Sequence, residues 1–324
     1  MADDEHWRSG RLVDVDRFVR AETDRYFAGI VGAEGLAALH HRRTPASVDE
    51  QTVVRMNRDT LYSHAVVDLA ASDVTVRLPE TNGRFMSLQV IDEDHYTPGV
   101  FYGTQPQRFS RERIGTRYAA LLIRTLVDPE NPADVRAVHG LQDAIELHVD
   151  DPGTFEVPDW DERTLTIVRD TLKRVAPTIV EVPAVGFGTA AEVDPIRHLV
   201  GTAIGWGANP EYAAVYVGAF PAHNDGTSPY VLRVRDVPVD GFWSISVYNE
   251  RGFFERNPFD RYSLNNLTAE AEEDGSVVVR FGGDPAAGNR LPIMPGWNYT
   301  VRMYRPRPEV LDGSWSFPEA EMAR

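Results

Sequence analysis

Two histidines and a run of acidic residues are the side chains best suited to chemistry. His64 lies in the segment LYSHAVVDL, and Glu93 and His95 lie in the run DEDHY. Side chains of a β-strand alternate between its two faces, so Glu93 and His95 are expected to share a face. If the two strands join one sheet in the matching register, His64 lies on the same face. A histidine polarised by a carboxylate can act as a general acid or base near neutral pH.

The same three side chains could instead bind a metal ion. Two histidines and one carboxylate suit iron, manganese or zinc. The compact His-x-Asp or His-x-Glu pair that such a strand would carry is absent from DEDHY. We therefore expect no metal or other cofactor, and His64, Glu93 and His95 are the expected ligands if a divalent metal does bind. A surface or purely structural role stays open for all three.

The segment MNRDTLYS, just before the His64 strand, holds two more candidates. Asp59 could be a catalytic carboxylate, or a turn residue that bonds to its own backbone. Arg58 could bind a substrate carboxylate through two guanidinium nitrogens. Tyr62 and Gln89 fall on the face expected for His64, so we expect them to contact a substrate if this face lines a pocket.

A long loop with the sequence NERGFFERNPFDRYSLNN is dense in arginine and aromatic residues. Loops of this length are uncommon unless they are functional or pack against another element. Tyr248, which precedes the loop, and Arg256 and Arg261 within it are therefore candidate substrate-binding residues. The same residue types are common at interfaces, so a domain or subunit interface is equally consistent with this loop.

Composition and missing motifs exclude several functional classes. The 324-residue chain has no cysteine, which rules out disulfides, thiolate catalysis and iron–sulfur clusters. Its formal net charge of -16 argues against nucleic acid or an anionic membrane as a partner. GFGTAA matches a loose dinucleotide fingerprint but lacks the following helix and acidic residue. The first ten residues, MADDEHWRSG, have no apolar core, so we expect no secretory signal and a cytoplasmic location.

One strand motif occurs twice. When Phe85 is placed on Phe242, residues 84–94 of the segment GRFMSLQVIDED align without a gap with residues 241–251 of GFWSISVYNERG. Alternation puts the large apolar side chains of each copy on one face, which predicts the core strand of two related β-domains. The other face mixes apolar and small polar groups, which suits either a solvated sheet face or a lined pocket.

The remaining pattern predicts a mainly β chain with a helical connector. An amphipathic helix is expected within VDVDRFVRAETDRYFAGIVG, and the connector is expected to be helical up to and including NPEYAAVYVGAF. Asp194 and His198 are spaced to pair on one helix face. Short β-rich runs between turn residues predict two tandem β-sandwiches of jelly-roll-like form. The expected segments are an N-terminal helical segment at 1–48, a first β-domain at 49–155, the helical connector at 156–225 and a second β-domain at 226–324.

Two parts of the chain resemble known domains. The stretch MNRDTLYSHAVVDL, followed by LPETNGRFMSLQVIDE, resembles the N-terminal domain of unknown function 1254, whose usual signature is Asn-x-Asp-Thr-Leu-Tyr-Ser. The stretches GFWSISVYNERGFFERNPFDRYSLNN, DGSVVVRF and LPIMPGWNYTVRMYRPRPEVLDGSW resemble the companion domain of unknown function 1214. The resemblance implies two β-sandwich domains, a helical segment between them and frequent oligomers, and it implies little chemistry. Family members commonly carry a more apolar segment in place of DEDHY, and many carry export signals.

These features lead to three expected functions. The first is a small-molecule enzyme that uses acid–base chemistry, such as hydrolysis, elimination or isomerisation, in a pocket of the first β-domain, without a redox or nucleotide cofactor. The second is a non-catalytic protein that binds a small-molecule ligand or assembles into a homo-oligomer. The third is a metal-dependent enzyme that uses the histidine and carboxylate set. The sequence leaves open whether the protein is an enzyme at all.

Overall fold

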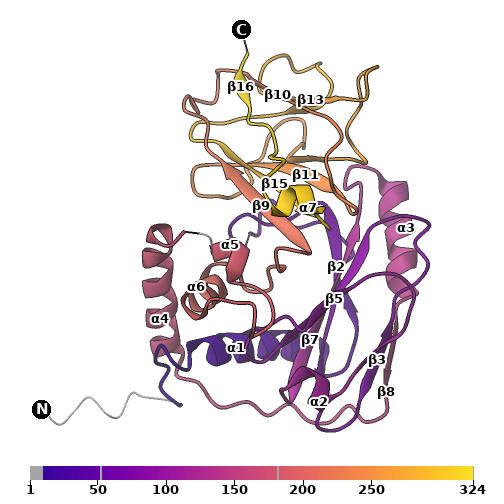
Figure 1. Ribbon diagram of the computed structural model, residues 1–324, viewed down its shortest axis with the longest axis vertical. Coiled ribbons are helices and arrows are strands. Elements are labelled where there is room, and N and C mark those ends of the chain that lie inside the picture. The colour runs from indigo at the N-terminus through magenta and orange to yellow at the C-terminus, as the bar shows by residue number, and fades with distance from the viewer. Residues whose placement is uncertain (1–9, 52, 181, 324) are drawn as a thin grey trace, which may run out of the picture. The chain divides into compact units, whose positions relative to one another are not determined.

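The computed structural model describes residues 10–51, 53–180 and 182–323. The N-terminal stretch 1–9, where we expect no secretory signal, lies outside the described residues. The chain divides into two compact units, each assembled from three separate stretches (Figure 1). The first unit comprises the described residues up to His41, with Tyr62–Arg124 and Leu141–Glu211. The second comprises Arg42–Leu61, Thr125–Gly140 and the described residues from Tyr212 onward. The segment expected as the first β-domain, 49–155, thus contributes stretches to both units.

Two sheets pack face to face in the first unit. The larger sheet has the strand order β1-β2-β7-β4-β5, and the smaller has the order β6-β3-β8. Their facing side chains form one core, which includes Val67, Val76, Leu88 and Leu121. This core confirms a β-sandwich, and it confirms that the apolar face of the first repeated strand, β4, faces a core. The strands are β1 (His40–His41), β2 (Thr60–Asp68), β3 (Val74–Arg77), β4 (Met86–Asp92), β5 (Gly99–Phe101), β6 (Gln107–Phe109), β7 (Tyr118–Leu126) and β8 (Glu146–Val149).

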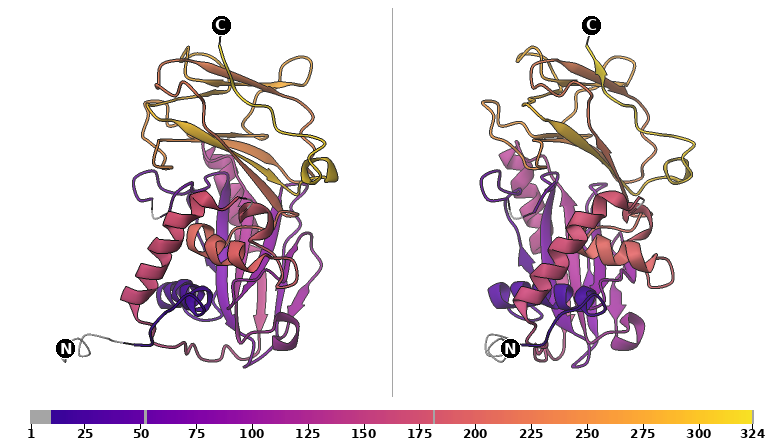
Figure 2. Two further views of the ribbon diagram at one scale, coloured as in Figure 1. Left: turned by 60° about the vertical axis from the view of Figure 1, so that its left-hand side comes forward. Right: turned by 90° about the vertical axis from the view of Figure 1, so that its left-hand side faces the viewer.

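Helices pack on the outer face of the larger sheet. α1 (Phe18–Glu34) reaches this face through Phe27, which joins Val66 of β2 and Ile91 of β4 in a second core. α4 (Glu162–Val175) and α6 (Pro195–Gly205) pack beside α1, on the same side of the sheet in both views of Figure 2. No helix in the described stretches is long and apolar enough to cross a membrane. The remaining helices are α2 (Arg111–Ile114), α3 (Pro132–Asp143), η1 (Ala176–Thr178), α5 (Val182–Val185) and α7 (Pro308–Leu311).

The expected pairing of Asp194 with His198 is wrong. Asp194 is the N-cap of α6, and its carboxylate accepts the backbone N–H groups of Ile196 and Arg197. These amides have no partner inside the helix, so an acidic N-cap stabilises its first turn. His198 binds backbone carbonyl groups, which are described below.

The second unit is also a sandwich of two sheets. Their strand orders are β14-β13-β10-β16 and β12-β11-β15-β9. Ile245 of β11, the second repeated strand, is fully buried in the shared core with Leu232, Phe281 and Val301. The repeat therefore marks an equivalent core strand in each sandwich. The strands are β9 (Ala214–Ala219), β10 (Tyr230–Val234), β11 (Trp243–Tyr248), β12 (Ser263–Asn265), β13 (Val277–Phe281), β14 (Arg290–Leu291), β15 (Asn298–Tyr304) and β16 (Glu321–Met322).

The stretch NPEYAAVYVGAF contains a strand and not the expected helix. β9 runs antiparallel to β15, with Val217 opposite Val301. The run Val-Tyr-Val favours a strand, and Gly218 disfavours a helix, so the local preference agrees with the sheet. Pro210, a residue type that suits the first turn of a helix, lies in the loop before the strand.

Candidate functional site

The mixed face of β4 is buried within the first unit. Gln89, at its centre, has no exposed surface. Arg124 of β7 donates from Nη1 to Gln89 Oε1 at 2.7 Å and from Nη2 to the carbonyl of Gly207 at 2.7 Å. The Gln89 amide donates to Thr97 Oγ1 and to the carbonyl of Ala208. The chain itself therefore covers this face, and the expectation of a solvated sheet face is wrong.

The mixed face of β11 is covered in the same way. Ser246 occupies the position that aligns with Gln89, and Arg302 of β15 donates from Nη1 to its hydroxyl at 2.9 Å. Nη2 of Arg302 donates to the carbonyl of Arg55 at 2.8 Å and to the Tyr248 hydroxyl at 2.6 Å. In each sandwich, a buried arginine thus joins the repeated strand to a covering segment of the same unit.

Neither arginine is among the residues that the sequence indicated for a site. Each is nonetheless the lone charged residue of its strand, in YAALLIRTL and in NYTVRMY. A buried guanidinium requires polar partners, so a lone arginine in such a strand is a usable signal for a buried polar contact. Burial acts to lower the pKa of Arg302, but the nearby Tyr248, Tyr304 and Asp59 outweigh that effect and raise it.

His95 is held between two hydrogen bonds. Its Nε2 accepts the backbone N–H of Gly207 at 2.9 Å, and its Nδ1 lies 2.8 Å from Thr202 Oγ1. The Thr202 hydroxyl donates to the carbonyl of His198, so His95 donates from Nδ1 and its ring is neutral. Burial, with a contribution from His198, lowers the pKa of His95 well below its usual value. This geometry leaves no ring nitrogen for proton transfer to a substrate.

A series of near-parallel ring contacts passes through His95. The contacts run from Tyr26 to Trp206, then to His95, His198 and Tyr96, with centroid separations of 4.2, 5.5, 5.6 and 4.6 Å in that order. Three separate parts of the first unit contribute to it: α1, α6 with the residue after it, and the loop that follows β4. The residues His-Tyr of DEDHY are therefore packing residues in this unit.

His64 and Glu93 have separate partners. His64 Nε2 lies 2.8 Å from Glu34 Oε2 at the end of α1. Glu93 Oε2 accepts the backbone N–H of Tyr118 at 3.0 Å, and its Oε1 lies 3.6 Å from Nη1 of Arg20. In the part of the chain that the structure describes, no three His, Asp or Glu side chains are grouped to hold a metal ion. The residues expected as metal ligands, His64, Glu93 and His95, are thus not brought together as a metal site.

Two buried carboxyls in the first unit have raised pKa values. Burial raises the pKa of Asp92 to about 7, although its Oδ1 accepts the backbone N–H groups of Asp94 and Tyr96. Burial likewise raises the pKa of Asp24 to about 6, although Trp160 Nε1 donates to it at 2.8 Å. Ionisation of either group opposes folding, so the stability of this unit depends on pH.

The contribution of Asp92 to the free energy of unfolding is expected to fall as the pH rises from 5 to 8. A raised folded-state pKa means that this contribution is complete below the unfolded value of 3.8 and is lost as the pH rises through about 7. One pKa unit corresponds to about 1.4 kcal/mol, so Asp92→Asn is expected to stabilise the protein by about 2–4 kcal/mol at pH 8 and by about half of that or less at pH 5. Urea unfolding at both pH values measures the two differences.

His95 changes stability in the opposite direction, which sets the design of that experiment. Its lowered pKa means that stability is lost as the pH falls below the usual value of 6.5. Only the difference between Asp92→Asn and wild type at each pH therefore isolates Asp92. Asp73→Asn, at a more accessible carboxyl, is the control and should show no such difference. Equal stabilisation by Asp92→Asn at pH 5 and pH 8 would contradict the raised pKa.

Four of the expected binding residues make contacts inside their own unit. Nε of Arg256 pairs with Asp49 at 2.6 Å, and Gln51 exchanges hydrogen bonds with the backbone of Phe254. The long loop that begins at Asn249 therefore packs on the stretch around 49–51 of the second unit. The other three are held as follows: Tyr248 by Arg302, Arg58 by the carbonyl of Ala46 and the ring of Tyr262, and Tyr62 beneath the guanidinium of Arg124.

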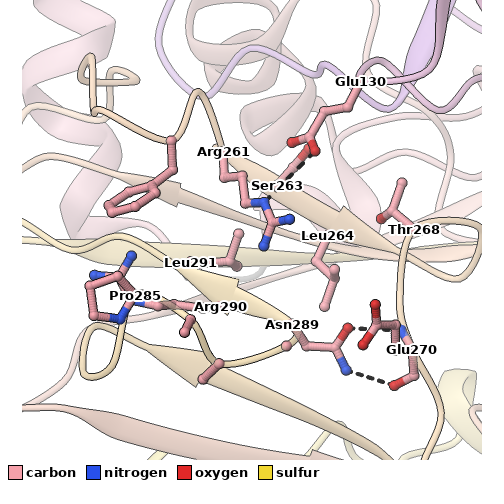
Figure 3. Close-up of a pocket in the computed structure, with 14 residues that line it drawn as sticks. Glu130, Arg261, Ser263, Leu264, Thr268, Glu270, Pro285, Asn289, Arg290 and Leu291 are labelled. Atoms are coloured by element: carbon pink, nitrogen blue, oxygen red, sulfur yellow. Dashed lines mark hydrogen bonds and ion pairs between the residues drawn. The ribbon is translucent and has the colours of Figure 1, made fainter.

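Arg261 lines a pocket of about 440 Å³ in the second unit (Figure 3). Its Nε lies 3.8 Å from Glu130 Oε2. Arg290 and Glu270 lie on opposite sides of the pocket, with Arg261 between them. Neither Arg290 nor Glu270 has an ion-pair partner among the residues that the structure describes. The other lining residues are Phe259, Ser263, Leu264, Thr268, Pro285, Ala286, Ala287, Gly288, Asn289 and Leu291.

Asp59 is buried behind one wall of this pocket. Its Oδ1 accepts Nδ2 of Asn265 at 3.1 Å, and the hydroxyl of Ser263 in the wall lies close to the same carboxyl. Burial raises the pKa of Asp59, and the charge of Arg302 opposes that rise. The turn expected for Asp59 is made by Asn57, whose Oδ1 accepts the backbone N–H of Asp59 at 2.8 Å.

Two families match the chain. The protein of unknown function DUF1254 matches residues 36–97, and the protein of unknown function DUF1214 matches residues 212–308. The chain is therefore a two-domain DUF1254/DUF1214 protein, as its sequence motifs indicated. No curated protein matches it.

Two solved structures share the fold. The VPA0106 protein from Vibrio parahaemolyticus is 16% identical, with a TM-score of 0.71 over 96% of this chain and 98% of its own. An uncharacterized protein from Burkholderia cenocepacia is 15% identical, with a TM-score of 0.52 over 95% of this chain and 88% of its own. At these identities the likeness shows the fold alone.

Proposed function

We propose that the protein binds a small zwitterionic molecule of the amino-acid class in the pocket around Arg261. The observation that supports this proposal is the pair of opposite charges, Arg290 and Glu270, on opposite sides of the pocket (Figure 3). A carboxylate matches a guanidinium, and an ammonium group matches a carboxylate. The volume of the pocket falls in the range of small-molecule sites.

The surroundings of Arg290 favour recognition of an anion. Its guanidinium lies over the ring of Phe259 at 4.8 Å, and its Nε donates to the carbonyl of Gly282 at 3.0 Å. These contacts fix the plane of the guanidinium, so less conformational entropy is lost when a carboxylate binds to it. Arg261 already pairs with Glu130, so we assign the main contact with the ligand's carboxylate to Arg290 and not to Arg261.

At least one member of a panel of L-amino acids is expected to bind the wild-type protein in isothermal titration calorimetry. Arg290→Gln and Glu270→Gln are each expected to weaken that binding about tenfold or more, because each removes one half of the charge match. Acetate and methylamine, which carry only one charge each, are expected to bind more weakly than the intact amino acid.

The matched control is Arg307→Gln, which removes an exposed arginine of the same unit that pairs with Asp240 outside the pocket. It should bind as the wild type does. The proposal fails if no member of the panel binds, or if Arg290→Gln binds as tightly as the wild type. Acid–base catalysis in the first β-domain receives less support, because both ring nitrogens of His95 are occupied. The cytoplasmic location and the homo-oligomer stay predictions.

A further inference from the structure

We infer that Asp59 is a positioning residue for the pocket: its buried carboxyl holds the wall formed by β12 and the following turn, without touching the bound molecule. The identity of the bound molecule in this inference rests on the proposed function. The role of Asp59 in holding the wall rests on the geometry of the second unit. Asp59 has no exposed surface and lies outside the pocket lining.

The contact begins at Asn265, the last residue of β12. Its Nδ2 donates to Asp59 Oδ1 at 3.1 Å, which fixes the orientation of the Asn265 side chain. The amide oxygen at the other end of that side chain accepts the backbone N–H groups of Leu267 at 2.9 Å and Thr268 at 3.2 Å. Thr268 lines the pocket. One carboxyl thus sets the conformation of the turn that carries a lining residue.

The same carboxyl also lies close to the strand before the turn. Ser263, which also lines the pocket, lies two residues before Asn265 and therefore on the same face of β12. Burial raises the pKa of Asp59, and the nearby hydroxyls of Ser244 on β11 and of Ser263 oppose that rise. Ser244 is the antiparallel partner of Asn265, so the carboxyl lies beside both β11 and β12 where it bonds to Asn265. Its Oδ2 has no hydrogen-bond partner of normal geometry in the described part of the chain, so the bond to Asn265 is its principal one.

Asp59→Ala and Asp59→Asn separate positioning from a general effect on folding. An asparagine at position 59 keeps an oxygen that can accept from Asn265, whereas an alanine leaves that amide without an acceptor. We expect Asp59→Ala to bind the tightest amino acid of the panel about tenfold more weakly, and its Leu267 and Thr268 amides to exchange with deuterium about tenfold faster. Asp59→Asn is expected to stay within about twofold of the wild type in both measurements.

Two further variants complete the test. Asn265→Ala breaks the same contact from its other end, so it should reproduce both effects if Asp59→Ala does not fold. Asp240→Ala, at an exposed aspartate of the same unit, is the control. Wild-type exchange at residues 267 and 268 in both Asp59→Ala and Asn265→Ala would overturn the inference, and so would an Asp59→Asn protein that behaves like Asp59→Ala. If no amino acid binds the wild type, the proposed function fails, while the exchange measurement still decides whether Asp59 holds the wall.

Discussion

Replacing Arg302 with methionine is expected to lower the free energy of unfolding by about 3–5 kcal/mol. The side chain is 3% exposed, and it donates hydrogen bonds to Ser246, to Tyr248 and to the carbonyl of Arg55. Methionine fills a similar volume but donates nothing, so these buried acceptors lose their donor. Urea unfolding followed by circular dichroism measures the loss.

The internal repeat supplies an independent check of this prediction. Arg124 makes the equivalent contacts in the first sandwich, so Arg124→Met is expected to lower the free energy of unfolding by a similar amount, about 3–5 kcal/mol. Arg307→Met removes an exposed arginine that pairs with Asp240 and should have little effect. If Arg302→Met and Arg307→Met unfold at the same urea concentration, the buried arginine does not hold its covering segment.

His198→Leu is expected to cost about 2–4 kcal/mol of stability. His198 Nδ1 lies 2.9 Å from the carbonyl oxygen of Gly186, and Nε2 lies 2.9 Å from that of Asp94. Carbonyl oxygens only accept, so the ring satisfies both of them when each nitrogen carries a proton. Leucine leaves both carbonyls unpaired at a site that is 4% exposed, and it removes a ring from the series of ring contacts.

His148→Leu is the matched control for that experiment, because the His148 side chain is 71% exposed. Thermal unfolding at one pH compares the two variants with the wild type. An unchanged midpoint for His198→Leu would show that the two carbonyl contacts contribute nothing to the fold of the first unit.

The core of each sandwich could be predicted from the sequence, because strand alternation is a local property. Met86, Leu88 and Val90 alternate with smaller or polar residues, and this pattern alone assigns them to a buried face. The helix at Phe18–Glu34 was predictable for the same reason, from apolar residues at helical spacing. The helix expected at β9 was wrong for a local reason. Pro210 and the helical pattern before it favoured a helix, although the run Val-Tyr-Val correctly favours a strand.

Whether the mixed faces are covered or exposed could not be predicted, because this depends on residues far away in the chain. Gln89 is covered by Gly207 and Ala208, and Ser246 contacts Arg302, which binds the carbonyl of Arg55. No local pattern distinguishes such a covered face from a solvated one or from the wall of a pocket. His64 and His95 shared a face in the predicted register, but each is held by partners from other elements.

Only part of the pocket could be predicted from the sequence. Arg261 was predicted to bind a ligand from the unusual composition of its loop, and it does line the pocket. Arg290 and Glu270 gave no signal, because an isolated charged residue is normally a solvated surface residue. Arg290 and Glu270 line one pocket only because the fold brings β12, β14 and the turns beside them together.

Chemical-shift mapping by NMR during titration with the panel of L-amino acids tests the central claim most directly. We predict that the backbone amide shifts that change with ligand concentration cluster at Arg261, Ser263, Glu270, Asn289 and Arg290, and that they saturate. Shifts that instead cluster around Gln89, His95 and Gly207 would place the site in the first sandwich and would contradict the account.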